Sequence, residues 1–256
     1  MQTNLFLRAI KKREPQAGLW ISLCSNYAAD VVATAGFDWA LLDMEHSPNE
    51  IGIVLSQMQA LTAGNTSAIA RPMWNDPVTV KRLMDVGAQS LLFPMVQSVE
   101  EAKLAVSATR YPPEGIRGVS GVQRANHFGR VTDYFDQVHN ETCVLIQIET
   151  MHALEQVEEI AKVDGVDGVF FGPADLSADM GKLGKVNDVQ LWEHIGNAAK
   201  VVEAVGKPAG TLVLDAEKAA RLFNNGFSFV ACGSDLGLLA RGADNLIAQV
   251  RKGINS

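Results

Sequence analysis

Short apolar runs recur along the chain, and each is followed by a segment in which apolar positions have helical spacing. Most positions within a run are apolar instead of alternating with polar ones, as is typical of parallel strands buried on both faces. The eight runs cover residues 17–23, 38–43, 66–71, 90–95, 142–148, 167–172, 208–213 and 227–232. The pattern predicts eight strands, each with a helix behind it.

The number of these units distinguishes a TIM barrel from a doubly wound sheet. Eight strand and helix units within 256 residues are typical of a (β/α)8 TIM barrel, whereas a doubly wound sheet more often ends at about five or six strands. The sequence Asn75-Asp76-Pro77 has the cap residue and the proline of a helix start, and Gly87 and Gly226 are typical of helix ends. We predict an α/β protein in which residues 1–256 form a single TIM-barrel domain.

One connection breaks the regular spacing. Residues 111–140 separate the end of a helix from the fifth strand, and a loop of this length in a compact domain is usually functional. Gly115, Gly118 and Gly121 lie in this loop, where they lack the strand-turn-helix context of a phosphate-binding motif. We expect a long functional loop before strand five.

Composition and charge narrow the class of partner. The chain is 47% hydrophobic and 20% charged, which is ordinary for a globular protein with a large core. The net charge of −7 and the pI near 5.3 disfavour binding to nucleic acid or to an anionic membrane. The first residues lack the pattern of a signal peptide, and no apolar run has the length of a membrane span. We expect a cytoplasmic protein that acts on small molecules.

The three cysteines give no sign of disulfides or of a metal-binding pair. Cys24, Cys143 and Cys232 are far apart in the sequence, and each lies in or beside an apolar run. This placement predicts reduced thiols that serve as small core residues.

Polar side chains gather where the predicted strands end. The carboxyl ends of the strands form the active-site mouth of a TIM barrel. The residues at these ends are Asp43, Glu45 and His46 after the second strand, Arg71 after the third, Gln147 and Glu149 at the fifth, and Asp175 after the sixth. We therefore predict one mouth that is rich in ionisable groups.

Each of these residues also has a purely structural interpretation. His46 could cap the next helix or satisfy a buried acid, and Arg71 could form a structural ion pair with the acids that end the second strand. Glu149 and Asp175 stand where helix caps belong. The hypothesis of a catalytic site rests on their combination.

Two carboxylates that converge on one mouth repel each other unless a proton or a cation lies between them. A hard divalent cation such as Mg²⁺ suits this arrangement, because a site with only two protein carboxylates leaves coordination positions for substrate oxygens. The backbone N–H groups of Ala174 and Asp175, at a predicted helix start, are suited to a substrate carboxylate. Together they predict a site for a 2-oxo acid.

An enolate can also form through a lysine Schiff base. None of the eight runs ends on Lys, and Lys207 precedes its strand, at the opposite mouth. The sequence therefore favours a metal-stabilised enolate, with Arg71 as the cation beside the oxyanion. His46 is the proton-transfer group in this hypothesis, because imidazole exchanges a proton near neutral pH.

The order of several motifs adds a resemblance. The chain contains GLWISL, GFDWALLDMEHSPN, ARPMWNDPVTVKRLMDVGAQSLLFPMV, TRYPPEGIRGV, CVLIQIET, VDGVFFGPADLSADMG and FVACGSDLGLLARGA. From about residue 5 to residue 248 it resembles the pyruvate-dependent class II aldolases typified by 4-hydroxy-2-oxoheptanedioate aldolase. The resemblance implies a Mg²⁺-, Mn²⁺- or Co²⁺-dependent enzyme that reversibly cleaves a 4-hydroxy-2-oxo acid to pyruvate and an aldehyde.

The resemblance also implies residue roles. Glu149 and Asp175 match the family's metal ligands, and Gln147 and Ala174 match contacts to the pyruvyl part, with Asp175 beside them. His46 matches the family's base and Arg71 its enolate-stabilising arginine. The family is typically hexameric, and its last helix packs onto a neighbouring subunit.

Asp85 matches the family's acid that makes the catalytic histidine more basic. Chain order places it at the end of the third strand-following helix, and therefore at the opposite mouth from His46. Either the chain path is irregular there or the two residues meet across a subunit contact.

Other functions remain open. A related lyase or isomerase could use the same site on hydroxypyruvate or on a CoA thioester, although the sequence shows no basic patch for a nucleotide phosphate. A non-catalytic barrel is a further alternative, which leaves the ionisable mouth unexplained. Met44 and the surroundings of Arg124-Ala125 depart from the family pattern, so the sequence does not specify the aldehyde.

Overall fold

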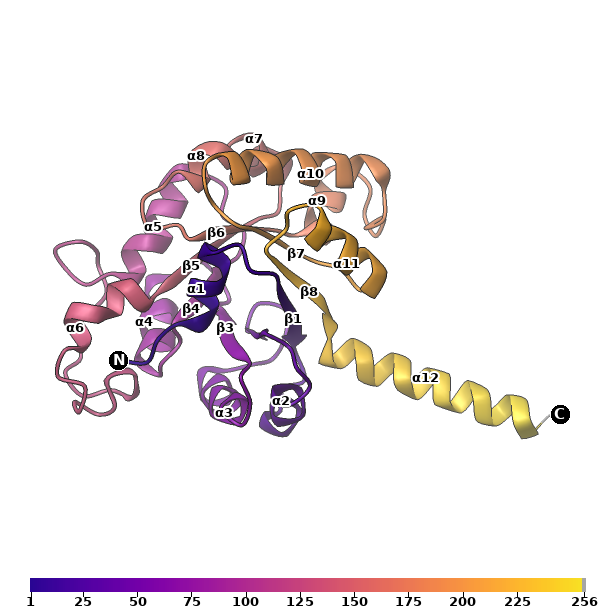
Figure 1. Cartoon of the computed structure of the whole chain (residues 1–256), viewed down its shortest axis with the longest axis horizontal. Helices are drawn as coiled ribbons and strands as arrows, with labels where there is room; N and C mark the ends of the chain where they lie inside the picture. The colour runs from indigo at the N-terminus through magenta and orange to yellow at the C-terminus, as the bar shows by residue number, and fades with distance from the viewer. Residues whose placement is uncertain (255–256) are drawn as a thin grey trace.

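The computed structural model describes residues 1–254 and shows a closed barrel of eight parallel strands (Figure 1). Each strand pairs with the next in chain order, and β8 pairs with β1. The strands are β1 (Gln16–Ile21), β2 (Trp39–Asp43), β3 (Ser67–Arg71), β4 (Ser90–Phe93), β5 (Cys143–Ile148), β6 (Gly168–Phe171), β7 (Ala209–Leu212) and β8 (Phe229–Ser234). The TIM-barrel prediction is confirmed, and each predicted run matches its strand to within two residues at either end.

Helices surround the barrel and fill the connections between strands. They are α1 (Leu5–Lys11), α2 (Asn26–Ala33), α3 (Ile51–Leu61), α4 (Pro77–Asp85), α5 (Val99–Thr109), α6 (Tyr134–Gln137), α7 (Met151–Glu155), α8 (Val157–Ala161), α9 (Pro173–Asp179), α10 (Val189–Ala204), α11 (Ala216–Asn224) and α12 (Asp235–Ile254). Within residues 1–254, none of the helices is long and apolar enough to cross a bilayer.

The ends of α4 follow from local chemistry. Asp76 is the N-cap, and its Oδ2 accepts a hydrogen bond of 2.8 Å from the backbone N–H of Thr79. Pro77 occupies the first turn, where its missing N–H costs nothing. Gly87 follows the helix with a φ of +107°, a conformation that favours glycine. The predicted start and end of this helix are confirmed.

Large aromatic residues fill the barrel interior. Trp39 and Phe229 are almost completely buried there, with ring centroids 6.3 Å apart. Gly18 makes room for this packing, because a Cβ at that position would lie 2.1 Å from the Trp39 ring. Phe6 and Ile10 of α1 join the same cluster, and the Phe6 ring packs edge-on against Phe229. Helix α1 therefore closes the amino end of the barrel.

The cysteines are free thiols, as predicted. Cys143 is completely buried in the barrel interior, and Cys232 is half-buried against the outer core. The prediction is wrong for Cys24, which lies half-buried in the turn after β1 with a φ of +54°. Its apolar neighbours belong to the strand, and the chain turns away from the core before Cys24.

The predicted long loop contains short helical turns. The 3-10 helix η1 (Arg124–Asn126), helix α6 and the 3-10 helix η2 (Val138–Glu141) interrupt it. Arg117 within it is almost completely buried, whereas Val119, Val122 and Phe128 are exposed. Because this segment joins the end of α5 to the start of β5, it lies toward the amino ends of the strands.

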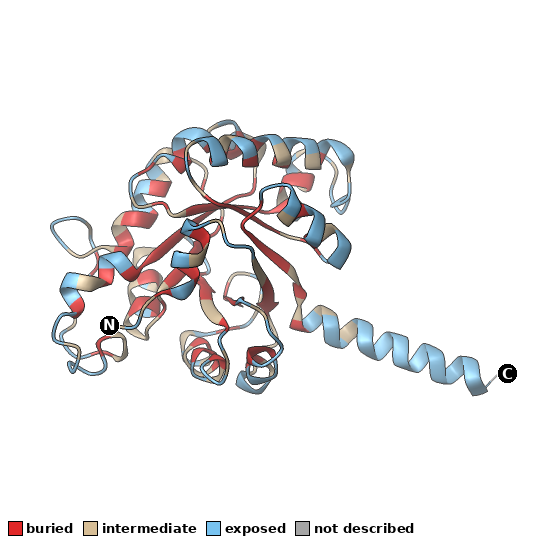
Figure 2. Cartoon of the chain, viewed as in Figure 1, coloured by how far each residue is buried: buried red, intermediate tan, exposed pale blue. Residues whose placement is uncertain are grey.

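Helix α12 projects away from the barrel (Figure 1). Figure 2 shows it as mostly exposed, and Asp235 is its one buried residue within the described part. Its exposed large apolar residues are Leu236, Leu238, Leu239, Leu246, Ile247, Val250 and Ile254. Monomeric proteins rarely expose so much apolar surface on one element.

Candidate active site

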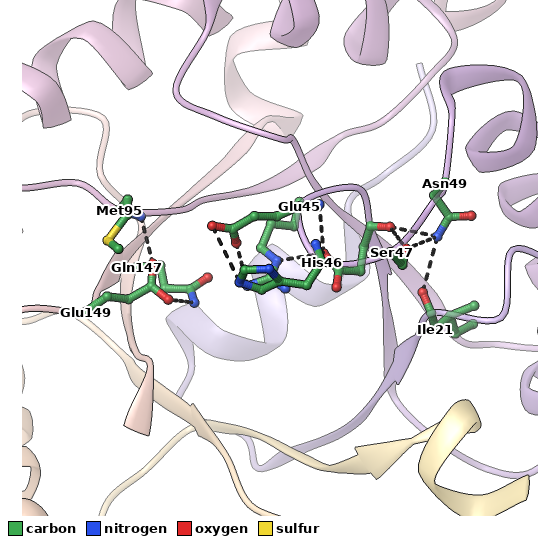
Figure 3. Close-up of polar contacts among 10 residues, drawn as sticks. Ile21, Glu45, His46, Ser47, Asn49, Met95, Gln147 and Glu149 are labelled. Atoms are coloured by element: carbon green, nitrogen blue, oxygen red, sulfur yellow. Dashed lines mark hydrogen bonds and ion pairs between the residues drawn. The ribbon is translucent and has the colours of Figure 1, made fainter. Parts of the chain in front are cut away.

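The carboxyl end of β2 turns sharply, and its own side chains hold the turn. The Asp43 Oδ1 atom accepts hydrogen bonds from the backbone N–H groups of Glu45 (3.0 Å) and His46 (3.4 Å). Buried Asn49 donates to the Asp43 carbonyl oxygen (2.7 Å), and Ser47 also donates to it. The turn brings Glu45 and His46 to the strand's carboxyl end (Figure 3).

Arg71 lies beside this turn and is held in one orientation. It is the register partner of Asp43, and its Nε atom donates to Asp43 Oδ1 at 2.9 Å. Its Nη1 atom lies 2.8 Å from Glu45 Oε2, and its guanidinium carbon lies 5.2 Å from the centroid of the Trp20 ring. Arg71 thus forms the structural ion pairs that the sequence allowed. No hydrogen-bond acceptor within residues 1–254 contacts its Nη2, which leaves that nitrogen for a ligand.

Gln147 and Glu149 form the deepest part of the mouth. Their exposed fractions are 3% and 2%. Gln147 Nε2 donates to Glu149 Oε1 at 2.7 Å, and the backbone N–H of Met95 donates to Glu149 Oε2 at 2.8 Å (Figure 3). Gln147 Oε1 is buried without a hydrogen-bond partner in the described part of the chain. A buried acceptor of this kind is expected to receive a donor from a ligand or from water.

The start of α9 completes the mouth. Gly172 is its N-cap, and a Cβ at that position would lie only 2.8 Å from Glu149 Cγ. Asp175 is half-buried in the first turn, next to exposed Ala174. The first N–H groups of an α-helix have no intrahelical acceptor, so the backbone of Ala174 and Asp175 can donate to an anion.

The buried acids Glu149 and Glu45 have raised pKa values. Burial raises the pKa of Glu149 to about 8, and the nearby carboxylates of Glu45 and Asp175 add to this rise, while the Met95 N–H and Arg71 oppose it. Burial also raises the pKa of Glu45, with Arg71 as the main opposing charge. The carboxylates of Glu45 and Asp175, from two other strand ends, therefore act on Glu149, and a cation beside Glu149 would relieve this repulsion.

His46 is exposed at the mouth. Its side chain is 64% exposed, and its Nε2 lies 3.8 Å from Glu45 Oε1. Figure 3 shows Glu45 and His46 together, across from the pair formed by Gln147 and Glu149. An exposed imidazole at this place can exchange protons with a ligand in the mouth and with solvent.

Asp85 does not meet His46 within one chain. It is the last residue of α4, which leads to the amino end of β4, and its Oδ1 lies 2.8 Å from the Nη2 of buried Arg117. Arg117 also stacks over the Tyr111 ring at 4.5 Å. The chain path at α4 is regular, so the hypothesis of an irregular path is wrong.

The residues at the mouth suit a hard divalent cation. Within residues 1–254 no three His, Cys, Asp or Glu side chains are grouped in a metal-holding arrangement. Glu149 and Asp175 offer carboxylate oxygens, which such cations prefer, and two protein ligands leave coordination positions for a substrate. Lys207 lies away from the mouth, as predicted, and its Nζ donates to the carbonyl of Val166 at 2.6 Å.

The sequence did not single out three residues that shape the site. Trp20 lies against Arg71, Asn49 braces the β2 turn, and Met95 donates its N–H to Glu149. The position of Trp20 near the carboxyl end of its predicted strand was an available signal. Asn49 and Met95 make their contacts from turns, and the hydrophobic pattern of the sequence does not predict the geometry of a turn.

The closed barrel and its ionisable mouth are those of a TIM-barrel enzyme. Among protein families, residues 16–242 match the HpcH/HpaI aldolase/citrate lyase family. The chain belongs to this family. The predicted resemblance is confirmed, and the protein is a lyase of the aldolase class.

Proteins of similar sequence or structure match this chain over nearly its whole length. The chain is 51% identical over 247 residues to the 4-hydroxy-2-oxo-heptane-1,7-dioate aldolase of Klebsiella pneumoniae, covering 96% of this chain and 93% of that protein. It is 49% identical to the enzyme of the same name from Salmonella dublin, with 96% and 94% covered. A crystal structure of a HpcH/HpaI aldolase/citrate lyase family protein from Burkholderia cenocepacia has 34% identity and a TM-score of 0.94, with 97% and 100% covered.

Proposed function

We propose that the protein is a divalent-metal-dependent aldolase that reversibly cleaves a 4-hydroxy-2-oxo acid to pyruvate and an aldehyde. The observation that carries this proposal is the convergence of Glu45, Glu149 and Asp175 on one mouth beside the clamped Arg71. The relatives named as 4-hydroxy-2-oxo-heptane-1,7-dioate aldolases support 4-hydroxy-2-oxoheptanedioate or a close analogue as the substrate.

Each half of the substrate has its own part of the mouth. Glu149 and Asp175 hold the cation, Mg²⁺, Mn²⁺ or Co²⁺, which when bound polarises the 2-oxo group of the substrate. Gln147 contacts the pyruvyl part, and the first-turn N–H groups of Ala174 and Asp175 bind its carboxylate. The deep burial of Gln147 and Glu149 supports an arrangement in which the pyruvyl half lies innermost.

The chemical step breaks the C3–C4 bond of the substrate. His46 removes the proton of the 4-hydroxyl group, the aldehyde forms, and the electron pair of the broken bond moves into the pyruvyl enolate. Nη2 of Arg71 donates to the enolate oxygen, where negative charge develops. Protonation of C3 then gives pyruvate. Asp43, Glu45 and Trp20 keep the guanidinium in place through these changes.

Metal dependence separates this proposal from Schiff-base chemistry. Pyruvate release from 4-hydroxy-2-oxoheptanedioate is measured after exhaustive chelation, after Mg²⁺, Mn²⁺ or Co²⁺ is returned, and after borohydride treatment with pyruvate present. We expect chelation to abolish cleavage, each metal to restore it and borohydride to have no effect. Activity that survives chelation and is destroyed by borohydride contradicts the proposal.

The active form is a homo-oligomer in our proposal, and the resemblance indicates a hexamer. Leu236, Leu239, Leu246, Val250 and Ile254 recur at spacings that place them along one side of α12, and all are exposed. A neighbouring copy covers this side. Leu246→Lys is expected to give smaller assemblies by light scattering, whereas a hexamer that persists in the variant contradicts this role of α12.

Asp85 acts across a subunit contact in this assembly. It lies at the amino end of the barrel in its own chain, so the His46 it contacts belongs to a neighbour. The test mixes dissociated His46→Ala and Asp85→Ala proteins and lets them reassemble. Random assembly returns about a quarter of the sites to the intact pair of residues. Verified mixed assemblies that regain no activity contradict a shared site.

A further inference from the structure

A second cavity lies on the outer wall of the barrel, between α10 and α11. Its volume is about 500 Å³, and its lining includes Trp192, Gly196 and Lys200 of α10 and Lys218 and Arg221 of α11. Buried Leu222 and Phe227 line it as well. The cavity shares no lining residue with the catalytic mouth.

The cavity is lined by positive charge, although the chain as a whole is negatively charged. Lys200, Lys218 and Arg221 all line it, although the chain has a net charge of −7. Within residues 1–254 no carboxylate forms an ion pair with Lys200 or Lys218, and Arg221 has a single long contact of 3.6 Å to exposed Glu217. Three cations with so little neutralisation form an attractive field for an anion.

One of the cations is already ordered. Lys218 Nζ lies 3.7 Å from the centroid of the Trp192 ring and donates to Asn187 Oδ1 at 3.1 Å. The Trp192 ring is itself held by its Nε1, which donates to the carbonyl of Val186 at 2.7 Å. Burial lowers the pKa of Lys218, the charge of Arg221 adds to this effect, and Asp215 opposes it. The ammonium group is thus placed before any ligand arrives.

We propose that this cavity binds a small ligand with a doubly charged oxyanion, held by Lys200, Lys218 and Arg221, with its apolar body against Leu222 and Phe227. Phosphate esters and dicarboxylic acids share this chemistry. An ammonium group and a guanidinium are the usual partners of both groups. Binding here is independent of the catalytic mouth.

The test uses the whole protein labelled with 5-fluorotryptophan and follows the fluorine resonance of Trp192, assigned with Trp192→Phe. Inorganic phosphate and malonate are titrated separately, with chloride as the ionic-strength control. We expect the Trp192 resonance to shift saturably at millimolar concentration of at least one dianion. The Trp20 resonance, next to Arg71, reports separately any binding at the mouth.

Substitutions inside and outside the cavity distinguish binding in the cavity from unspecific attraction of anions to surface charge. Lys218→Gln is expected to weaken binding at least tenfold, whereas Lys103→Gln, at an exposed position of α5, leaves it unchanged. Gly196→Leu keeps all three cations and fills the cavity. It should fold normally, since a Cβ at position 196 meets nothing within 4 Å, and it should also abolish binding.

The outcomes decide the proposal and the source of the ligand. Tenfold tighter binding of phosphate assigns phosphate esters, tenfold tighter malonate assigns dicarboxylic acids, and similar binding leaves the shared oxyanion as the determinant. The proposal is overturned if no dianion saturates the Trp192 shift, if chloride reproduces it, or if Gly196→Leu still binds as well as the parent protein.

Discussion

Gly172 and Glu149 touch at the floor of the catalytic mouth, where a Cβ on residue 172 would lie 2.8 Å from Glu149 Cγ and 2.9 Å from its Oε1. Gly172→Ala must therefore displace Glu149. We expect kcat/KM to fall by about 10²-fold, the usual cost of misplacing a group by about 1 Å at a reacting centre.

The matched control for this prediction is Gly52→Ala. Gly52 is an exposed position in α3 where a Cβ meets nothing within 4 Å. The control should keep native activity and gain up to about 1 kcal/mol of stability, because alanine favours a helix more than glycine does. Native activity in Gly172→Ala would show that Glu149 can move aside for the methyl group without loss of catalysis.

Arg71 has a structural and a chemical role that two substitutions can separate. Arg71→Ala leaves buried Asp43 without its cation, and we expect a loss of about 3 kcal/mol of stability. Arg71→Lys keeps a charge there but lacks the planar fork. Both variants should lose at least about 10²- to 10³-fold in aldol cleavage, and in exchange of the pyruvate C3 protons followed by NMR in D₂O. Exchange at the native rate would make Arg71 a structural ion-pair partner only.

His46 is expected to serve chemistry and not binding. His46→Ala should reduce kcat by about 10²- to 10⁴-fold, the span for loss of a positioned base, while pyruvate and Mn²⁺ bind as in the parent protein. Calorimetry measures the binding, and pyruvate release measures kcat.

Asp85 should act through His46. Asp85→Asn should lower kcat in the parent protein and have little further effect in the His46→Ala background, as expected of two groups that work as a unit. Losses that add in the double variant would assign Asp85 to its ion pair with Arg117 instead.

Asp76 gives a pH dependence of stability with a definite sign. Its hydrogen bonds with the Thr79 hydroxyl and backbone N–H lower its pKa. A carboxyl group whose pKa is lower in the folded state stabilises the protein above the unfolded pKa, and this contribution is lost as the pH falls through the folded pKa. Asp76→Ala should cost about 1 kcal/mol at neutral pH.

Asp76→Asn is the sharper comparison for this half-buried residue, since asparagine also caps helices. We expect a few tenths of a kcal/mol or less between the two proteins, after solvent screening. Thermal unfolding at fixed protein concentration should show a constant difference from about pH 5 to 8 that shrinks below about pH 4. A difference that grows in acid has the wrong sign for this account.

Strands and strand ends were predictable because burial and chemistry both follow local sequence there. The run that ends at Asp43 is apolar until it reaches the mouth, and the change to charged residues marks the boundary. The convergence of Arg71, Glu149 and Asp175 follows from the fold, since all the parallel strands end at one mouth.

The unpredicted features depend on geometry that a single sequence does not contain. The sequence identifies Trp20 only as a core residue, because its side chain does help to fill the barrel. Its contact with Arg71 depends on the strand register, which the sequence does not show. Cys24 follows an apolar strand but lies beyond its last residue. The amphipathic pattern of α12 would equally suit packing on its own barrel, so the sequence does not predict the direction in which the helix projects.

The packed interior and helix α1 close the barrel opposite the mouth, where Phe6 and Ile10 join the aromatic cluster. Substrate entry and product exit must then share a single opening. Gln147 and Glu149 lie at the bottom and His46 at the rim, so the proposed cleavage predicts that the aldehyde leaves first and pyruvate second. For the proposed reaction in the synthetic direction, the same geometry predicts that pyruvate enters before the aldehyde and that an aldehyde that arrives early obstructs its own reaction.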